Sequence, residues 1–267
     1  MGLIKKVWRI ILVPEYIFRK LVEFFIKPFA GIESFGFIEA IAYSWRIDVW
    51  LRYSRIAKEL NNLAGEKITV LDIGAGGRGI SEFIDTDRFK IYVLDINPKA
   101  FGDMNRELVP IIGDGSRLPF VDKTFDVAIS VDSLEHVPDA LKKNCICELF
   151  RVARKKVIMH FPVVGGEYDG LNYDIKFNDA YKHYFGNDEP NTYEHIKAGL
   201  PRLTDLKEFF SDLEIKGTQN CSVWYKYMIL ERLPYVNLVS GLYYKLFLER
   251  DNQKPPFHSC MIVKNMK

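Results

Sequence analysis

The fold of this chain is decided at one stretch of sequence, Val70-Leu71-Asp72-Ile73-Gly74-Ala75-Gly76-Gly77-Arg78-Gly79. An apolar, β-branched run ends at an acidic residue and passes at once into a glycine-rich turn. That order predicts a buried strand, a loop that passes close to a ligand, and then a helix. The N-terminus of such a helix offers unpaired N–H groups and a partial positive charge. We therefore expect a nucleotide-like cofactor at this turn.

Two cofactors compete for the turn. Gly74, Gly76 and Gly79 spell G-x-G-x-x-G, and Asp95 follows about 20 residues later, as in dinucleotide-binding folds. Asp72 favours the other cofactor, S-adenosylmethionine, because a carboxylate beside the turn repels a pyrophosphate. S-adenosylmethionine carries no phosphate, and its ammonium and sulfonium groups are attracted to nearby carboxylates. An NAD-linked oxidoreductase stays as an alternative interpretation.

Two further motifs follow the next apolar runs. The first is Gly113-Asp114-Gly115-Ser116-Arg117-Leu118-Pro119-Phe120, where an acid can accept a hydrogen bond from an adenine amino group. The second is the strand-like run Phe125–Asp132, which leads directly into Ser133-Leu134-Glu135-His136-Val137.

With these motifs in this order, the sequence resembles class I S-adenosylmethionine-dependent methyltransferases, in particular the small-molecule group of ubiquinone and menaquinone biosynthesis. The resemblance runs from about Lys67 to Phe161. It departs from the family pattern D-x-G-x-G-x-G at Arg78, which stands at the third glycine position.

The resemblance implies a role for each matched residue. Gly74 and Gly76 would approach the methionyl part, and Asp72 would lie near the ammonium, or would instead cap the next helix. Asp95 would accept both ribose hydroxyls, and Ile96 would pack on adenine. The full set of implied cofactor-binding residues is Asp72, Gly74, Ala75, Gly76, Asp95, Ile96, Asp114, Gly115, Ser116, Asp132 and Ser133.

The expected fold class is α/β, a doubly wound and mostly parallel sheet of seven strands. We expect a helical extension or lid over residues 1–64 and the cofactor-binding domain over 65–267. Cofactors of such sheets lie beyond the carboxyl ends of the strands. The predicted parallel strands are Ile68–Asp72, Arg88–Ile96, Val109–Gly113, Asp126–Val131 and Lys156–Phe161, with helices between them, the clearest over Ala140–Ala153.

Other segments are predicted from periodicity and turn signals. Apolar spacing predicts a long helix over Phe37–Leu63, and the turn-rich segment 163–201 is expected to be a long functional loop. A helix capped by Thr204 is expected over Leu203–Leu213. Strands are expected over Glu214–Val223 and Ser259–Lys264, with an aromatic helical insertion over residues 224–250 between them. The resemblance implies that these two strands form an antiparallel pair that completes the seven-stranded sheet.

Composition limits the function classes. The 267 residues carry a net charge of only +2, which argues against a nucleic-acid-binding surface. The four cysteines, at positions 145, 147, 221 and 260, show neither metal-ligand spacing nor a compact disulfide pattern, so we expect free thiols in a reducing cytoplasm. Residues 1–30 are basic and apolar without forming a membrane span. They are either a helical lid or an amphipathic segment that lies on a membrane surface.

The reaction implied is in-line transfer of a methyl group, which needs alignment and exclusion of water, and in some cases removal of a proton. His136, His195 and His160 are the candidate bases, and we expect no metal. The aromatic insertion and basic start suggest a small-molecule, lipid-linked or glycan-precursor acceptor, methylated at oxygen. Alternatively, these two segments pack together as extra core or form a homodimer face. A separate alternative for the whole chain is a non-catalytic scaffold of the same fold.

Overall fold

The computed structural model describes residues 47–76, 79–102, 104, 107–209, 213–231 and 254–264. The predicted lid and membrane-surface segment, with the first part of the Phe37–Leu63 helix, therefore lie outside the described residues. Most of the predicted insertion, residues 232–250, lies outside them too.

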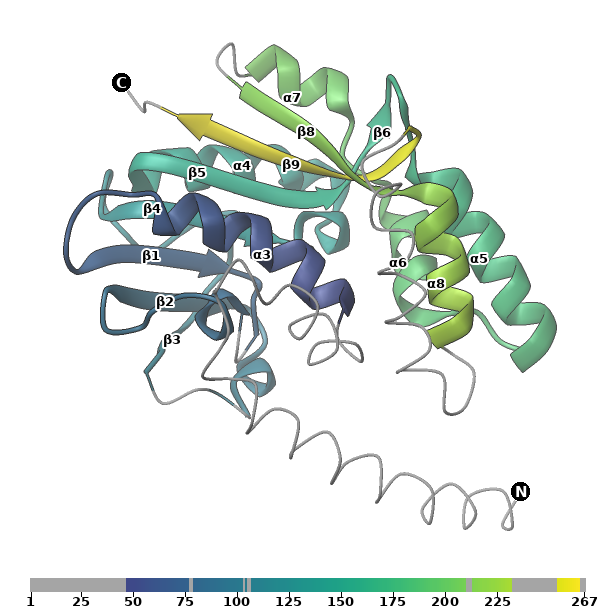
Figure 1. The fold of residues 1–267 in the computed structure, drawn as a ribbon, viewed down its shortest axis with the longest axis horizontal. Helices are drawn as coiled ribbons and strands as arrows, with labels where there is room; N and C mark the ends of the chain where they lie inside the picture. Colours follow the sequence, from purple (N-terminus) through teal and green to yellow (C-terminus); the bar gives the residue numbers. More distant parts are fainter. Residues whose placement is uncertain are drawn as a thin grey trace, which may run out of the picture.

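A seven-stranded sheet with the order β3-β2-β1-β4-β5-β9-β8 forms the centre of the molecule (Figure 1). Strands β1 to β5 run parallel, and β9 is antiparallel to both β5 and β8. The predicted fold class and the terminal antiparallel pair are confirmed. The strand bounds are β1 Ile68–Ile73, β2 Phe89–Asp95, β3 Val109–Ile112, β4 Phe125–Val131, β5 Ala153–Pro162, β8 Leu213–Asn220 and β9 Pro256–Lys264.

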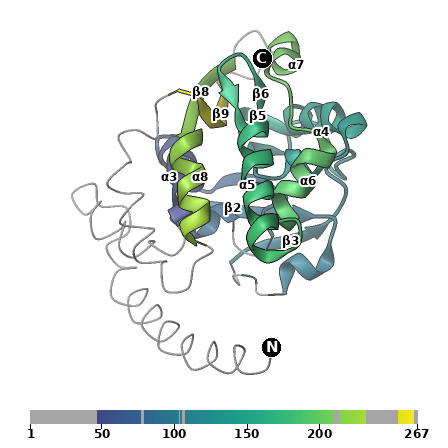
Figure 2. The same cartoon turned by 90° about the vertical axis from the view of Figure 1, so that its right-hand side faces the viewer.

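The central strands are continuous apolar runs because helices cover both faces of the sheet. Helix α3 (Ile47–Asn61) buries Ile56 and Leu60 against β1, β2 and β4. Helix α4 (Asp139–Val152) buries Leu149 and Val152 on the opposite face, which α7 (Leu203–Phe209) also covers. In the turned view of Figure 2, α3 and α4 lie on opposite sides of the strands.

The helices that follow β1 and β2 are shorter than expected. Within the described residues, the segment after β1 holds a 3-10 helix at Gly79–Glu82, and the segment after β2 holds another at Pro98–Phe101. The predicted helices between these strands are thus single short turns. A third 3-10 helix, Leu134–His136, follows β4.

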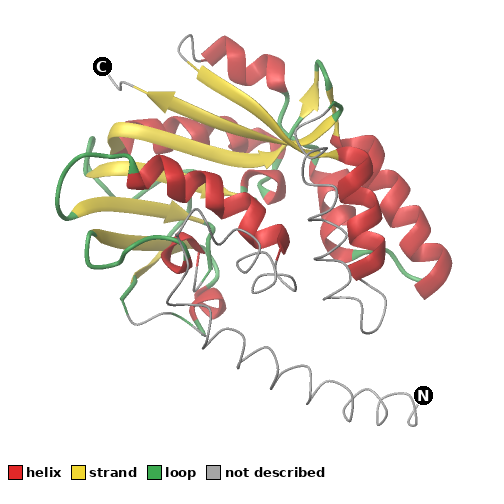
Figure 3. Ribbon diagram, in the orientation of Figure 1, coloured by secondary structure: helices red, strands yellow, loops and turns green. Residues whose placement is uncertain are grey.

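The prediction of a long loop over residues 163–201 is wrong. The segment folds as a short hairpin, β6 (Val164–Gly165) with β7 (Tyr168–Asp169), and then as helices α5 (Gly170–Phe185) and α6 (Pro190–Ala198). Figure 3 shows these helices in red. The predicted turns are present, but each lies between a strand and a helix or between two helices, and they do not form one continuous loop. Gly186 adopts the left-handed conformation that ends α5, with φ of +80°.

Three boundaries near the C-terminus also need correction. Helix α7 ends at Phe209, and Thr204 lies inside it, bonded to the side chain of Asp205, so it is not the cap. Strand β8 ends at Asn220, and α8 (Cys221–Glu231) begins where continued strand was predicted. The side chain of Asn220 explains the change, because its Oδ1 accepts hydrogen bonds from the N–H groups of Ser222 and Val223.

Helices α5, α6 and α8 form a group beyond the carboxyl ends of the parallel strands (Figures 1 and 2). Helix α5 packs against α6 and α8, and α6 packs against the 3-10 helix after β4. None of the helices within the described part of the chain has the length and apolar character needed to cross a bilayer. The helical group places side chains from distant parts of the sequence next to the strand ends.

Candidate functional site

Backbone hydrogen bonds join the ends of neighbouring strands into one edge. The N–H of Gly74 donates to the carbonyl of Leu94 at 2.8 Å, and the N–H of Gly113 donates to that of Asp95 at 3.1 Å. On the other side, the N–H of Asp132 donates to the carbonyl of His160 at 2.8 Å. The predicted site residues therefore emerge from adjacent strands at the same edge of the sheet.

The glycines of the turn are required for different reasons. Gly74 has φ of +75°, and a Cβ there would lie 2.2 Å from Oγ of Ser133. Gly79 has φ of +49°, and its Cβ would lie 2.4 Å from Oδ2 of Asp72. At Gly76, with φ of +63°, the nearest atom to a Cβ is the carbonyl oxygen of Ala100 at 3.7 Å. Gly74 and Gly79 thus serve the packing of the loop, whereas Gly76 leaves open space. Arg78 lies outside the described residues.

Asp72 is fully buried beneath the turn. Its Oδ2 accepts a hydrogen bond of 3.1 Å from the N–H of Ile80, at the start of the 3-10 helix. Its Oδ1 is buried without a hydrogen-bond partner among the described residues. Burial raises the pKa of Asp72 to about 7. The hydrogen bond from Ile80 is the one expected if Asp72 caps the next helix. A contact between Asp72 and the ammonium group of a cofactor stays a prediction.

Asp95 and Asp114 end their strands with the same local turn. Oδ1 of Asp95 accepts from the N–H of Asn97, and Oδ1 of Asp114 accepts from the N–H of Ser116, each at 2.8 Å. These hydrogen bonds hold the pKa of Asp114 below its usual range. Ile96 directly after Asp95 is 70% exposed, an unusual position for a large apolar side chain at a strand end.

The other implied cofactor-binding residues lie on the same edge. Ala75 follows Gly74 in the turn, and Gly115 approaches β1, where a Cβ would lie 3.3 Å from Cγ2 of Ile73. Ser133 begins the 3-10 helix after β4 without forming a side-chain cap. The accessible acids of this edge are the half-buried Asp95 and the exposed Asp114, with exposed Ile96 beside them.

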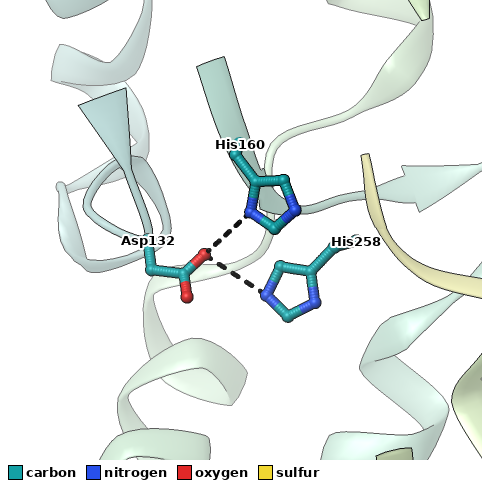
Figure 4. A group of neighbouring side chains, drawn as sticks. All are labelled: Asp132, His160 and His258. Atoms are coloured by element: carbon teal, nitrogen blue, oxygen red, sulfur yellow. Dashed lines mark ion pairs between the residues drawn. The ribbon is translucent and has the colours of Figure 1, made fainter. Parts of the chain in front are cut away.

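Asp132, at the end of β4, is the centre of a buried charge cluster. Its Oδ1 lies 3.3 Å from Nε2 of His258 and 3.6 Å from Nδ1 of His160 (Figure 4). Its Oδ2 forms an ion pair with Arg52 of α3. The two imidazole rings are stacked, with centroids 5.0 Å apart, and Nε2 of His160 lies 3.2 Å from Oγ1 of Thr218.

The electrostatics of this cluster follow from Arg52. Burial by itself would raise the pKa of Asp132. The guanidinium of Arg52 and the nearby histidines outweigh this effect and hold the pKa well below its usual range. Burial lowers the pKa of His258 to about 4. The cluster therefore combines an ionised carboxylate with a neutral imidazole. His160, predicted as a candidate base, is fully buried within this network.

The other two predicted histidines come together a short distance away. The rings of His136 and His195 lie 4.9 Å apart between centroids. Nδ1 of His136 lies 3.0 Å from Oε2 of Glu194, and Nδ1 of His195 lies 3.0 Å from Oδ2 of Asp174. Burial and the neighbouring His195 lower the pKa of His136.

Five residues of this region were not predicted from the sequence. They are Arg52, Glu135, Asp174, Thr218 and His258. Only Glu135 carries a local signal, because it stands next to His136 in the motif after β4. The others come from α3, α5, β8 and β9, and no spacing along the chain indicates that these elements meet.

Residues 71–161 match the sequence family described as "Methyltransferase domain". The match covers the glycine turn, the ends of β2, β3 and β4, and the motif after β4. These residues are therefore similar to a methyltransferase domain, as the sequence motifs predict. Membership of the ubiquinone and menaquinone biosynthesis group stays a prediction.

A curated relative is the mouse (Mus musculus) protein "Arginine-hydroxylase NDUFAF5, mitochondrial", 25% identical over 228 residues. The alignment covers 76% of this chain, and the chain spans 65% of the length of that relative.

Solved structures share the fold. A protein described as a methyltransferase from an antibiotic biosynthesis pathway of Anabaena variabilis aligns with a TM-score of 0.51 and 14% identity, over 81% of this chain and 99% of that one. A protein of Galdieria sulphuraria, described as a sarcosine dimethylglycine methyltransferase, also has a TM-score of 0.51, with 17% identity over 83% of this chain and 85% of that one.

Proposed function

We propose that the protein is an enzyme that moves the methyl group of S-adenosylmethionine to oxygen of a small-molecule, lipid-linked or glycan-precursor acceptor. The observation that carries this proposal is the placement of four acidic side chains along the strand-end edge, of which Asp95 and Asp114 are neither fully buried nor paired with Arg52. Asp72, Asp95, Asp114 and Asp132 lie at the ends of four adjacent parallel strands. A sulfonium cofactor with a free ammonium group suits such an edge, whereas a pyrophosphate would meet repulsion from it.

The cofactor roles follow the geometry of the edge. We assign the ribose hydroxyls to Asp95, because its Oδ2 is not used by the turn that holds Oδ1. We assign the adenine amino group to Asp114, with Gly115 and Ser116 beside it, and the adenine face to Ile96. Gly76 leaves room for the methionyl part. Asp132 and Ser133 lie at the end of β4, next to the turn, where the sulfonium would be.

S-adenosylmethionine supplies a methyl group that is already activated for transfer. The chain therefore has to align the acceptor, exclude water and accept a proton where the acceptor loses one. His136 and His195 suit the last task, because each Nδ1 is held by a carboxylate and each Nε2 remains available. Burial of His160 and its contact with Thr218 favour a positioning role for that residue instead.

The helical group beyond the strand ends supports an acceptor with apolar character. Phe177 of α5, Trp224 of α8 and Phe257 of β9 form a buried aromatic cluster. The rings of Trp224 and Phe257 are stacked, with their centroids 3.9 Å apart. The outer surfaces of α5 and α6 expose Ile175, Tyr184, Phe185 and Tyr193. Aromatic side chains of this kind pack against both hydrocarbon chains and sugar rings. The cytoplasmic, peripheral-membrane location and a homodimer stay predictions.

The test measures cofactor binding and methyl transfer on the full-length chain. Isothermal titration with S-adenosylmethionine, S-adenosylhomocysteine and NAD should show binding of the two adenosyl sulfur compounds and none of NAD. Incubation of extracts with tritiated S-adenosylmethionine and the protein should label the lipid or glycan fraction. Binding of NAD alone would contradict the proposal. Cofactor binding without transfer to any fraction would favour a non-catalytic scaffold.

A further inference from the structure

Glu135, His136 and His195 form a group that the sequence does not bring together. Glu135 and His136 lie in the 3-10 helix after β4, and His195 lies on α6. Each offers one ligand atom, and these atoms all lie within 4.8 Å of one another. Because α6 packs against the 3-10 helix, the group is held by the fold of the helical region.

The two imidazoles are oriented in the same way. Glu194 and Asp174 each approach Nδ1 of one ring at 3.0 Å, which favours the tautomer that carries its proton on Nδ1. Nε2 is then a free lone pair on both rings, and within the described part of the chain it has no hydrogen-bond partner. A carboxylate on the far nitrogen is the usual support of a metal-bound histidine.

The third side chain needs a partner that the described protein residues do not supply. Glu135 is 1% exposed, and its Oε2 is buried without a hydrogen bond among the described residues. A cation next to Glu135 would neutralise this buried carboxylate, and each histidine offers a ring nitrogen within 4.8 Å of the other ligand atoms.

We propose that Glu135, His136 and His195 bind one divalent first-row transition-metal ion, with Asp174 and Glu194 orienting the imidazoles. Two nitrogens and one carboxylate oxygen favour zinc, iron, cobalt or manganese over magnesium or calcium. Three protein ligands leave further coordination positions open to a substrate oxygen. This inference opposes the expectation from sequence spacing that no metal binds.

The second two-histidine group, formed by Asp132, His160 and His258, is a weaker candidate. Arg52 already neutralises Asp132, and a guanidinium next to that carboxylate repels a cation. Oδ1 of Asp132 and Nδ1 of both histidines are also buried without a hydrogen bond among the described residues, so the argument against a metal here rests on Arg52. The two groups lie close together, and the experiment has to distinguish them.

The site deepens the proposed function and replaces one assignment in it. Histidines that bind an ion through Nε2 no longer accept a proton there; instead the ion would hold the acceptor oxygen at the strand-end edge and lower its pKa, so that the proton can pass to solvent. That use of the ion rests on the proposed function. Metal binding itself does not, because it is measured without methyl transfer.

The experiment uses full-length protein without an affinity tag, stripped with a chelator and titrated with Co²⁺, with Zn²⁺ as a competitor. Visible absorption reports the coordinated Co²⁺, and elemental analysis gives the stoichiometry. We expect one ion per chain. Replacement of a ligand, His195→Ala or Glu135→Gln, should weaken binding by at least about 100-fold, and Asp174→Asn by about 10- to 100-fold. His183→Ala, an exposed histidine on α5, is the matched control and should bind as the wild type does.

Two outcomes would overturn the inference. One is a wild-type chain that binds no stoichiometric metal. The other is loss of binding in His258→Asn with retention in His195→Ala, which would assign the ion to the Asp132 group. His136→Gln, at a partly exposed position, replaces His195→Ala if that variant does not fold. S-adenosylhomocysteine binding is measured on the same samples, so loss of the metal site alone leaves the proposed function standing.

Discussion

The two halves of the strand-end edge are built in different ways. The glycine-loop half consists of the ends of β1, β2 and β3, where Gly74, Asp95 and Asp114 each follow their own strand. The histidine half consists of the ends of β4, β5 and β9 with helices α3, α5 and α6 around them. The first half is made of short local motifs, in which Asp114 is exposed, Asp95 is half-buried and Asp72 is buried. The second is a buried network whose members come from distant segments.

From this difference we infer that one half binds the cofactor and the other recognises the acceptor. A cofactor shared by many enzymes can be held by a local loop and by strand-end acids, because each needs only its own strand to be placed correctly. A group that recognises one acceptor requires side chains from several elements at once. We therefore expect substitutions in the two halves to affect different measurements.

The largest effect should come from the pH dependence of Asp72, the buried acid beneath the glycine loop. Its ordinary pKa is 3.8 and its folded pKa is about 7, so the folded chain binds the proton more tightly. Stability from this group is present below pH 4 and falls as pH rises through 7, by about 4 kcal/mol in total. Asp72→Asn should remove most of that slope in urea unfolding between pH 4 and pH 8. Asp179→Asn, an exposed acid on α5, serves as control; parallel slopes for wild type and Asp72→Asn would contradict the assignment.

Gly74→Ala should weaken S-adenosylhomocysteine binding by about 100-fold or more. The new Cβ would lie 2.2 Å from Oγ of Ser133, at a positive φ, so the loop must move away from the cofactor. Gly186→Ala is the matched control, because its φ is also positive while nothing lies within 4 Å of the added Cβ. Circular dichroism verifies that both variants fold. Equal affinities in calorimetry would show that the loop does not contact the cofactor.

Asp95→Asn should weaken the same binding by about 10- to 100-fold, the loss expected for hydrogen bonds to a charged group. Asp85→Asn provides a close control. Oδ1 of Asp85 accepts from the N–H of Asp87 in the same local turn, at 3.0 Å, but the residue lies before β2, away from the edge. If both variants lost affinity equally, the ribose role of Asp95 would have to be abandoned.

The smallest effect is expected for Thr218→Val, a substitution in the histidine half. It removes the hydroxyl that contacts Nε2 of buried His160, at a cost of about 1–2 kcal/mol in the free energy of unfolding. S-adenosylhomocysteine affinity should stay within about twofold of wild type. Thr204→Val, whose hydroxyl bonds exposed Asp205, should change stability by no more than about 0.5 kcal/mol. A marked loss of cofactor affinity in Thr218→Val would show that the histidine half also contributes to cofactor binding, which contradicts the proposal.

The sheet was predictable because its signals are local. Each buried strand is a continuous apolar run, and a polar or glycine residue marks its end, so strand bounds agree with the structure to within a few residues. The terminal antiparallel pair came from the family resemblance, and the antiparallel pairing of β8 with β9 confirms it.

Helices α5 and α6 were missed for a physical reason. The inward face of α5 contains buried Asp174 and Asn178, four residues apart, where a helix normally repeats apolar residues. Asp174 meets His195, and Asn178 contacts Asp188 and the N–H of Glu189. Since Asn178 and one oxygen of Asp174 find partners in the next segment, the helix forms without the apolar periodicity that a search along the chain detects.

The sequence by itself determined the parallel sheet, the glycine turn and the acids at the ends of its strands, because each depends on residues that are neighbours in the chain. Only the tertiary structure decided which histidines meet which carboxylates. His258 reaches Asp132 through the pairing of β9 with β5, and His195 reaches His136 through the packing of α6. Burial then sets the charges of these groups, and burial is a property of the assembled fold.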